Sequence, residues 1–318
     1  MPRELTDSSR EAYKKNIIRL NNGDPIKISK KGIPDYKFLK DTNAILEKIK
    51  HLKPNTQRSY LISIVSSIKD IKSLEPAHKI YHDLMMQFIK EVSNTNNKKS
   101  DTQEENWIPQ EEVMRIYNEL FDKVMPLLSL KKVNKNQWGE ILPFVVLSLY
   151  VLQAPRRSKD YQQMKYLNTP KELGEDFKQF NYFDPKDGIF KFFVYKTAGT
   201  YNVQEIEVNP KLREILGKYM KLSPLKKDKN PLILVNYDGV PISPVNGITR
   251  ILNKLFNRKI SVSMLRSIYL TDKFSGATQE FMDTATAMGT SKNVIQDKYV
   301  KLGGKLEDVL SNNLSEDN

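Results

Sequence analysis

The sequence predicts a mainly helical protein with a small β-sheet, divided into two domains. Its 318 residues, 39% of them hydrophobic, are enough to build two cores. Residues 93–106 contain no apolar side chain, so we expect a linker there. Apolar residues recur at helical spacing on both sides of it. The predicted parts are therefore residues 1–92, the linker, residues 107–304 and a tail of residues 305–318.

Three or four helices are predicted in the first domain. Apolar side chains recur every three or four positions in three stretches, residues 13–20, 39–49 and 60–68. The third helix is expected to open at residues 54–56, Pro-Asn-Thr. Asn or Thr can cap free backbone N–H groups there, and the proline discourages an earlier start.

The second domain is predicted to combine helices with one pair of strands. A helix is expected to start within residues 107–113, and the nearly continuous apolar segment 138–152 predicts a buried helix. Residues 189–208 are rich in β-branched and aromatic side chains on both sides of Gly199, which predicts a β-hairpin. Helical patterns return in three later segments, residues 210–219, 244–256 and 262–274.

The composition favours a polyanionic partner. With 51 Lys and Arg against 38 Asp and Glu, the formal charge is +13, which suits nucleic acid or an anionic membrane surface. No stretch approaches the roughly 20 apolar residues needed to span a bilayer, and the N-terminus lacks the apolar segment of a signal peptide. We therefore expect no membrane partner and an intracellular protein.

The cysteine and histidine content limits which metal sites and nucleophiles the protein can form. The absence of cysteine excludes disulfides, thiolate nucleophiles and cysteine metal sites. The three histidines, His51, His78 and His82, all lie in the first third, so the C-terminal part cannot form a histidine-rich metal site. We read His78 and His82 as a surface pair, and no metal or other cofactor is expected.

Paired arginines follow the predicted buried helix. Residues 154–164 read Ala-Pro-Arg-Arg-Ser-Lys-Asp-Tyr-Gln-Gln-Met. The planar fork of an arginine suits phosphate oxygens and stays charged at any ordinary pH. Taken alone, such a pair more often marks a solvated helix start.

This segment resembles the first arginine motif of tyrosine recombinases, the lambda-integrase-like family of phage integrases. In that motif an Arg is followed at the third position by Glu or Asp, and at the fourth and seventh by leucines. Counting from Arg157 puts Asp160 at the third position and two apolar residues at the fourth and seventh. Counting from Arg156 puts polar or charged residues at all three positions. The resemblance implies that Arg157 belongs to the active site and that Arg156 binds DNA nearby.

A second arginine motif lies further along the chain. Residues 261–269 resemble the family's His-x-x-Arg helix, which implies that Arg266 is directed at the phosphate while Leu265 and Ile268 pack inward. Ser263 stands where the family has histidine. A serine is not a comparable proton acceptor near neutral pH.

The predicted hairpin carries a lysine at its turn. Residues 195–197, Tyr-Lys-Thr, resemble the family's β-hairpin Lys-Thr. The resemblance implies that Lys196 reaches the scissile step and protonates the departing 5′ oxygen.

The strongest resemblance concerns the nucleophile. Residues 288–299 resemble the family's Leu-Gly-His-Ser segment, whose tyrosine follows the glycine by ten residues. Gly289 is expected to supply a turn, and Tyr299 is the implied nucleophile. Thr290 occupies the position usually filled by His or Trp, so both histidine positions of the active site, Ser263 and Thr290, carry hydroxyl residues instead.

The first domain resembles the helical core-binding (SAM-like) domain of recombinases, so the implied architecture is that domain followed by a catalytic domain of the DNA breaking-rejoining fold. In the family the two domains close around double-stranded DNA, and four protomers assemble on two duplexes. The resemblance implies a tetramer on DNA here, with self-association through a predicted helix at residues 305–314. The implied location is wherever the target DNA lies, cytoplasm or nucleus. The Pro-Arg-Arg variant is similar to integrases of large DNA viruses and mobile elements.

The resemblance also implies phosphate contacts in the first domain. They are Lys50, Lys53, Arg58, Lys69 and Lys72.

The predicted function is site-specific recombination or integration through a 3′-phosphotyrosyl intermediate on Tyr299. One alternative is a catalytically impaired DNA-binding relative, which the missing histidines favour. Another is a type IB topoisomerase, which shares the chemistry. That alternative fits poorly, because Ser291-Lys292 is followed by Tyr299 and then by Val-Lys-Leu rather than by an Asp-Pro-Arg run.

Overall fold

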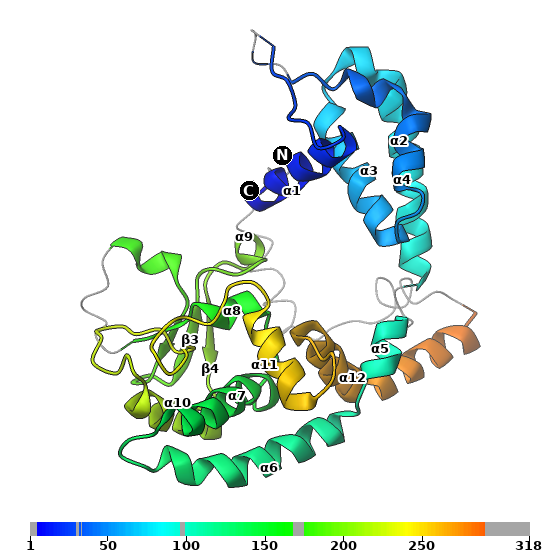
Figure 1. The fold of residues 1–318 in the computed structure, drawn as a ribbon. Helices are drawn as coiled ribbons and strands as arrows, with labels where there is room; N and C mark the ends of the chain where they lie inside the picture. The colour runs from blue at the N-terminus through cyan, green and yellow to red at the C-terminus, as the bar shows by residue number, and fades with distance from the viewer. Residues whose placement is uncertain (1–4, 30–31, 33, 96–98, 168–174, 290–318) are drawn as a thin grey trace. The chain divides into compact units, whose positions relative to one another are not determined.

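The computed structural model describes residues 5–29, 32, 34–95, 99–167 and 175–289 (Figure 1). The chain divides into an N-terminal unit, Met1–Ser100, and a C-terminal unit, Asp101–Asn318. The described residues are mainly helical and contain one small mixed sheet, which confirms the predicted fold class at that level. No helix among them is long and apolar enough to cross a membrane.

The N-terminal unit is built around one apolar core. Its helices are α1 (Asp7–Leu20), η1 (Lys37–Lys40), α2 (Thr42–Ile49), α3 (Pro54–Ile68), η2 (Lys72–Leu74) and α4 (Glu75–Thr95). Leu61 and Ile64 of α3 are fully buried, and the buried Tyr81 hydroxyl donates to the Leu39 carbonyl oxygen at 3.0 Å. The helix predicted to open at residues 54–56 starts at Pro54. Its cap is Lys53, without a side-chain hydrogen bond, so Asn and Thr lie inside the first turn and do not cap it.

The segment predicted as a linker is partly helical. The α4 helix continues to Thr95, and α5 (Asp101–Asn106) follows, while residues 96–98 lie outside the described residues. Asn106 is buried, and its Oδ1 accepts a hydrogen bond from the Lys259 backbone N–H at 2.9 Å. This contact within the C-terminal unit helps to order a polar stretch that its composition alone predicts to be irregular.

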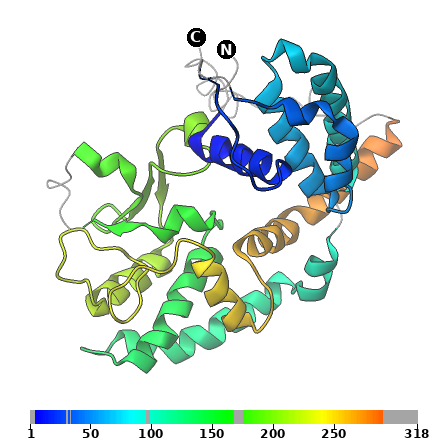
Figure 2. The same ribbon diagram turned by 45° about the horizontal axis from the view of Figure 1, so that its top comes forward.

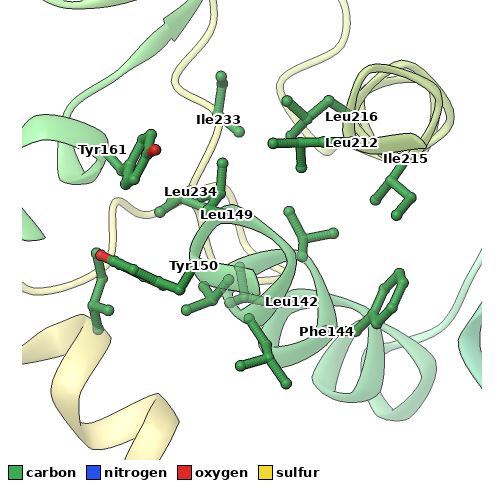
Figure 3. Close-up of a cluster of buried hydrophobic side chains, with 14 of the residues drawn as sticks. Leu142, Phe144, Leu149, Tyr150, Tyr161, Leu212, Ile215, Leu216, Ile233 and Leu234 are labelled. Carbon is green, nitrogen blue, oxygen red and sulfur yellow. The ribbon is translucent and has the colours of Figure 1, made fainter. Parts of the chain in front are cut away.

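The C-terminal unit is organised around α7, the predicted buried helix. Its helices are α6 (Gln110–Leu128), α7 (Lys135–Val151), α8 (Ser158–Gln162), η4 (Glu175–Gln179), α9 (Ala198–Tyr201), α10 (Pro210–Leu222), α11 (Gly247–Phe256) and α12 (Val262–Ala287). Asn134 and Gln137 form a reciprocal capping box at the start of α7. Figure 3 shows α7 within the core, with Leu212 and Leu216 of α10 on one side and Tyr161 on another.

Four short strands form a single sheet in the order β1-β2-β3-β4. They are β1 (Lys165–Tyr166), β2 (Tyr182–Asp184), β3 (Ile189–Phe192) and β4 (Gln204–Glu207). The pair β1–β2 is parallel and the others are antiparallel. The predicted hairpin is confirmed as the β3–β4 pair, but its strands are shorter than predicted, and residues 193–203 between them contain a turn and α9.

The helix predicted at residues 262–274 is also longer, since α12 runs to Ala287. The preceding helix, α11, begins at Gly247 rather than at Pro244. After α12, Gly289 adopts a left-handed conformation with φ +62°, which confirms the predicted turn. The predicted tail, including its helix at 305–314, lies outside the described residues.

Gly188, in the turn between β2 and β3, provides a stability test. It has φ +71°, and a Cβ built there lies 2.5 Å from one terminal guanidinium nitrogen of Arg213. We expect Gly188→Ala to lower the free energy of unfolding by about 1–3 kcal/mol, because the left-handed backbone strains a residue with a Cβ and the Arg213 guanidinium must also move aside. Gly217→Ala, inside α10 with open space at its Cβ, should instead raise it by about 0.5–1 kcal/mol.

Urea unfolding followed by tryptophan fluorescence measures both variants. The two tryptophans, Trp107 and Trp138, belong to the C-terminal unit, so the signal reports on that unit. Equal stability of Gly188→Ala and the parent protein would contradict the expected strain.

Candidate functional site

The two neighbouring arginines lie between the core helix α7 and the short helix α8. Arg157 is the N-cap residue of α8, in an extended conformation, and its carbonyl oxygen accepts the Asp160 backbone N–H at 3.0 Å. Figures 1 and 2 show α8 between the β3–β4 pair and the start of α11. The side chains of Arg156 and Arg157 differ in what holds them.

Arg156 is held inside the protein by four contacts. Its Nε donates to Asp160 Oδ2 at 2.9 Å, and a terminal nitrogen donates to Gln204 Oε1 of β4 at 2.8 Å. The guanidinium carbon lies 3.8 Å from the centroid of the Phe192 ring and 5.1 Å from that of Tyr195. Arg156 therefore ties α8 to both strands of the hairpin, and its predicted role in DNA binding stays a prediction.

Arg157 is half-buried, and its guanidinium differs from that of Arg156 in its surroundings. Among the described residues, none forms a hydrogen bond with its side chain or an ion pair within 4.0 Å. Burial raises the pKa of the Asp160 carboxyl, and the charges of Arg156 and Arg157 offset part of that rise. Asp160 is thus neutralised mainly by Arg156, which leaves the donors of Arg157 available.

Arg266 lies beside the arginine pair. Ser261 caps α12 through its side chain, and Leu265 and Ile268 are buried as predicted. The Nε of the half-buried Arg266 donates to the carbonyl oxygen of Pro155 at 3.2 Å. The structure therefore places Arg266 against the backbone two residues before Arg157, although the two arginines are more than a hundred positions apart in the sequence.

Ser263 lies in the first turn of α12, and its side chain is exposed. A polar cleft of about 620 Å³ is lined by Ser263 and by Ser158, the residue after Arg157. Asn246 and Arg250 of the α11 region line the same cleft. Ser263 therefore opens onto a cleft next to the arginine segment.

Lys196 lies in the segment that joins β3 to β4. The Ala198 N–H donates to the Tyr195 carbonyl oxygen at 3.1 Å, which closes a turn around Lys196 and confirms the predicted turn position. Its side chain is exposed, and no hydrogen bond or ion pair holds it among the described residues.

Asn181 connects this segment to α8 and was not predicted from the sequence. Its Nδ2 donates to the carbonyl oxygens of Asp160 and Val194, both at 2.9 Å. Gln204, which binds Arg156, was also missed. Neither residue carries a sequence signal, since an isolated amide side chain resembles any polar loop or edge-strand residue.

The two remaining predicted active-site residues, Thr290 and Tyr299, lie outside the described residues. The described chain reaches Gly289, directly before Thr290. In the part of the chain that the structure describes, no group of three acidic, histidine or cysteine side chains is arranged to bind a metal. His78 and His82 lie on α4 with ring centroids 6.1 Å apart.

The predicted phosphate contacts of the N-terminal unit lie at the ends of its helices or on α3. Lys50 pairs with Glu47, and Lys69 Nζ lies 4.0 Å from Asp70 Oδ2. Lys53 and Lys72 are exposed and form no ion pair with any described residue, and Arg58 is half-buried on α3. Lys50 and Lys69 therefore each have an acidic neighbour with which a phosphate group would compete.

Comparisons of the chain with protein families, with curated proteins and with solved structures find no match. The family resemblance therefore rests on the motifs alone. What the structure adds is the placement of the described motif residues relative to one another within the C-terminal unit.

The two arginines should respond differently to truncation. Arg156→Ala leaves the buried Asp160 carboxylate without its pair, and we expect it to lower the free energy of unfolding by about 3 kcal/mol at neutral pH. Arg157→Ala removes no hydrogen bond or ion pair with any described residue and should change the free energy of unfolding by less than about 0.5 kcal/mol. Urea unfolding with tryptophan fluorescence measures both.

The loss in Arg156→Ala should depend on pH. Burial already raises the pKa of Asp160 above 3.8, and removing Arg156 raises it further. A folded-state pKa above the unfolded one means that protonation favours the folded state, so the loss should shrink as the pH is lowered. If Arg157→Ala were instead the less stable of the two variants at neutral pH, the structural role of Arg156 would be contradicted.

Proposed function

We propose that this protein cuts and rejoins DNA strands as a tyrosine recombinase, forming a 3′-phosphotyrosyl intermediate through Tyr299. The observation that carries the proposal is the 3.2 Å hydrogen bond from Arg266 Nε to the Pro155 carbonyl oxygen. It holds a second guanidinium beside the segment of Arg157, whose donors have no partner in the part of the chain that the structure describes. Two arginines at one place suit a phosphate whose transition state carries extra negative charge.

In the proposed step, the Tyr299 oxygen forms a bond to phosphorus while the bond from phosphorus to the 5′ oxygen breaks. The phenol proton passes to solvent, because a phenol with an ordinary pKa of about 10 must lose it to attack. Lys196 gives a proton to the departing 5′ oxygen and regains one from solvent. Arg157 and Arg266 balance the charge on the two non-bridging oxygens.

The resulting ester conserves the energy of the phosphodiester bond. A 5′ hydroxyl of a partner strand can then attack the phosphotyrosine and release the Tyr299 oxygen, so neither ATP nor a metal is needed. The N-terminal unit would add affinity for the duplex, because the excess of basic residues is concentrated in residues 1–100. Tetramer formation on DNA is part of this proposal by family resemblance alone.

A catalytically impaired DNA-binding relative is the second candidate. It is favoured by the exposed Ser263, which replaces an imidazole at the edge of the polar cleft. The sequence has no histidine after His82, so no imidazole of the C-terminal unit can take that role. The topoisomerase alternative gains no support from the contacts.

Covalent trapping tests the nucleophile. The protein is incubated with a nicked DNA duplex, or with one that carries a bridging 5′ sulfur, and adducts are resolved on a denaturing gel. We expect an adduct with the parent protein and none with Tyr299→Phe, which lacks the attacking oxygen. Tyr201→Phe, at an exposed phenol of α9 close to Lys196, is the matched control and should retain the adduct.

An adduct that persists in Tyr299→Phe would refute the assignment of the nucleophile. Specific binding to DNA without any adduct, for either substrate, would favour the impaired relative.

The salt dependence of binding tests the N-terminal unit. A plot of log Kd against log salt concentration should lose about one unit of slope for each phosphate contact that is removed. We expect this loss for Lys53→Ala and for Lys72→Ala, and no loss for Lys221→Ala on α10. Fluorescence anisotropy with labelled duplex measures the slopes, and identical slopes for all variants would exclude these lysines from the interface.

A further inference from the structure

The Asn181 side chain joins two parts of the candidate site through four hydrogen bonds. Its Nδ2 donates to the carbonyl oxygens of Asp160 and Val194, both at 2.9 Å. Its Oδ1 accepts the backbone N–H groups of Phe193 at 2.9 Å and of Val194 at 2.8 Å. Both donors and both acceptor positions of the amide are therefore used, at a residue only 4% exposed.

These four bonds reach both sides of the proposed reaction centre. Asp160 follows Arg157 by three positions in α8, and Val194 precedes Lys196 by two. Phe193 and Val194 lie beyond the end of β3, so the β4 ladder does not hold their N–H groups. The Asn181 side chain accepts these two N–H groups in place of a neighbouring strand. It therefore bridges α8, which follows Arg157, and the segment that carries Lys196.

Other contacts restrain the same segment from its far end. The Tyr195 hydroxyl donates to the Asn202 carbonyl oxygen at 2.6 Å, and Arg156 binds Gln204. The backbone around Lys196 is thereby held at Val194, at Tyr195 and at the start of β4. The lysine side chain itself has no partner among the described residues, so its reach toward a phosphate held by Arg157 depends on where this backbone is placed.

We infer that Asn181 is a positioning residue that sets the proton donor Lys196 against the arginine that binds the phosphate. The inference rests on the proposed function. Asn181 touches no reacting atom. It acts by fixing the distance between the group that protonates the 5′ oxygen and the group that holds the phosphate, and a misplacement of about 1 Å can cost about 100-fold in rate.

Replacing the leaving oxygen separates this role from a general structural one. A bridging sulfur at the 5′ position departs as a thiolate, which is stable near neutral pH without receiving a proton, so a displaced lysine no longer matters. Asn181→Asp keeps the size and one acceptor oxygen but removes the Nδ2 donors, and it sets an oxygen against the two carbonyl oxygens. The cleavage rates of the oxygen and sulfur substrates are compared for each variant.

With the oxygen substrate, Asn181→Asp should cut about 100-fold more slowly than the parent protein. With the sulfur substrate its rate should return close to the parental rate, as it should for Lys196→Ala. Arg157→Ala should be slow with both substrates, because sulfur does not replace the charge that holds the phosphate. Asn236→Asp is the matched control, since its Oδ1 also accepts two backbone N–H groups in a turn, and it should match the parent protein.

A full rate for Asn181→Asp with oxygen, or an equal loss with both substrates, would overturn the inference. A parent protein that forms no adduct with either substrate would instead remove the proposed function and this inference with it. Thermal unfolding confirms that each variant is folded.

Amide hydrogen exchange of the parent protein tests the bridge even if Asn181→Asp does not fold. The Phe193 and Val194 amides should exchange as slowly as those of the β3–β4 ladder, because a buried side chain binds them. Exchange as fast as that of an exposed turn would show that the bridge is absent and would overturn the inference.

Discussion

The burial of the Asp160 carboxylate is the constraint on which the candidate site depends. Its side chain is 3% exposed, and a buried charge is tolerated only when a counter-charge and hydrogen bonds compensate for the water it has lost. Arg156 supplies the counter-charge and one hydrogen bond, to Oδ2, and reaches on to Gln204 of β4, while the buried Oδ1 has no hydrogen-bond partner among the described residues. Arg156 is committed to this task and fixes α8 against the hairpin. The guanidinium of the half-buried Arg157 has no hydrogen-bond or ion-pair partner among the described residues.

Buried polar side chains set the remaining geometry of the C-terminal unit in the same manner. The Trp138 Nε1 donates to the Val235 carbonyl oxygen, and the Tyr219 hydroxyl donates to that of Ile233, so irregular backbone is fastened to the core. Asn181 does this for the segment of Lys196. A leucine core can define where helices pack, but directional bonds of this kind decide where a loop places a functional group.

The elements predicted well are those whose pattern is long or whose chemistry is local. The apolar run of α7, the proline at the start of α3 and the left-handed Gly289 are of this kind. The strands β1 and β2 were missed because two or three residues show no alternation. The prediction for α12 stopped at residue 274, although apolar residues such as Leu270, Phe274 and Phe281 continue at helical spacing. These side chains are half-buried or exposed in the structure, so the pattern there does not mark a face packed on the core.

By itself, the sequence determined which chemistry is available: the cations, the absence of cysteine, the lack of histidine beyond residue 82 and the order of the motifs. It also favoured Arg157 over Arg156 through the spacing to Asp160. Only the tertiary structure decided that Arg156 is bound by buried partners and that Arg266 meets the Pro155 carbonyl. The reason is physical, because a guanidinium is free or engaged according to neighbours that come from distant parts of the chain, and local sequence patterns do not contain them.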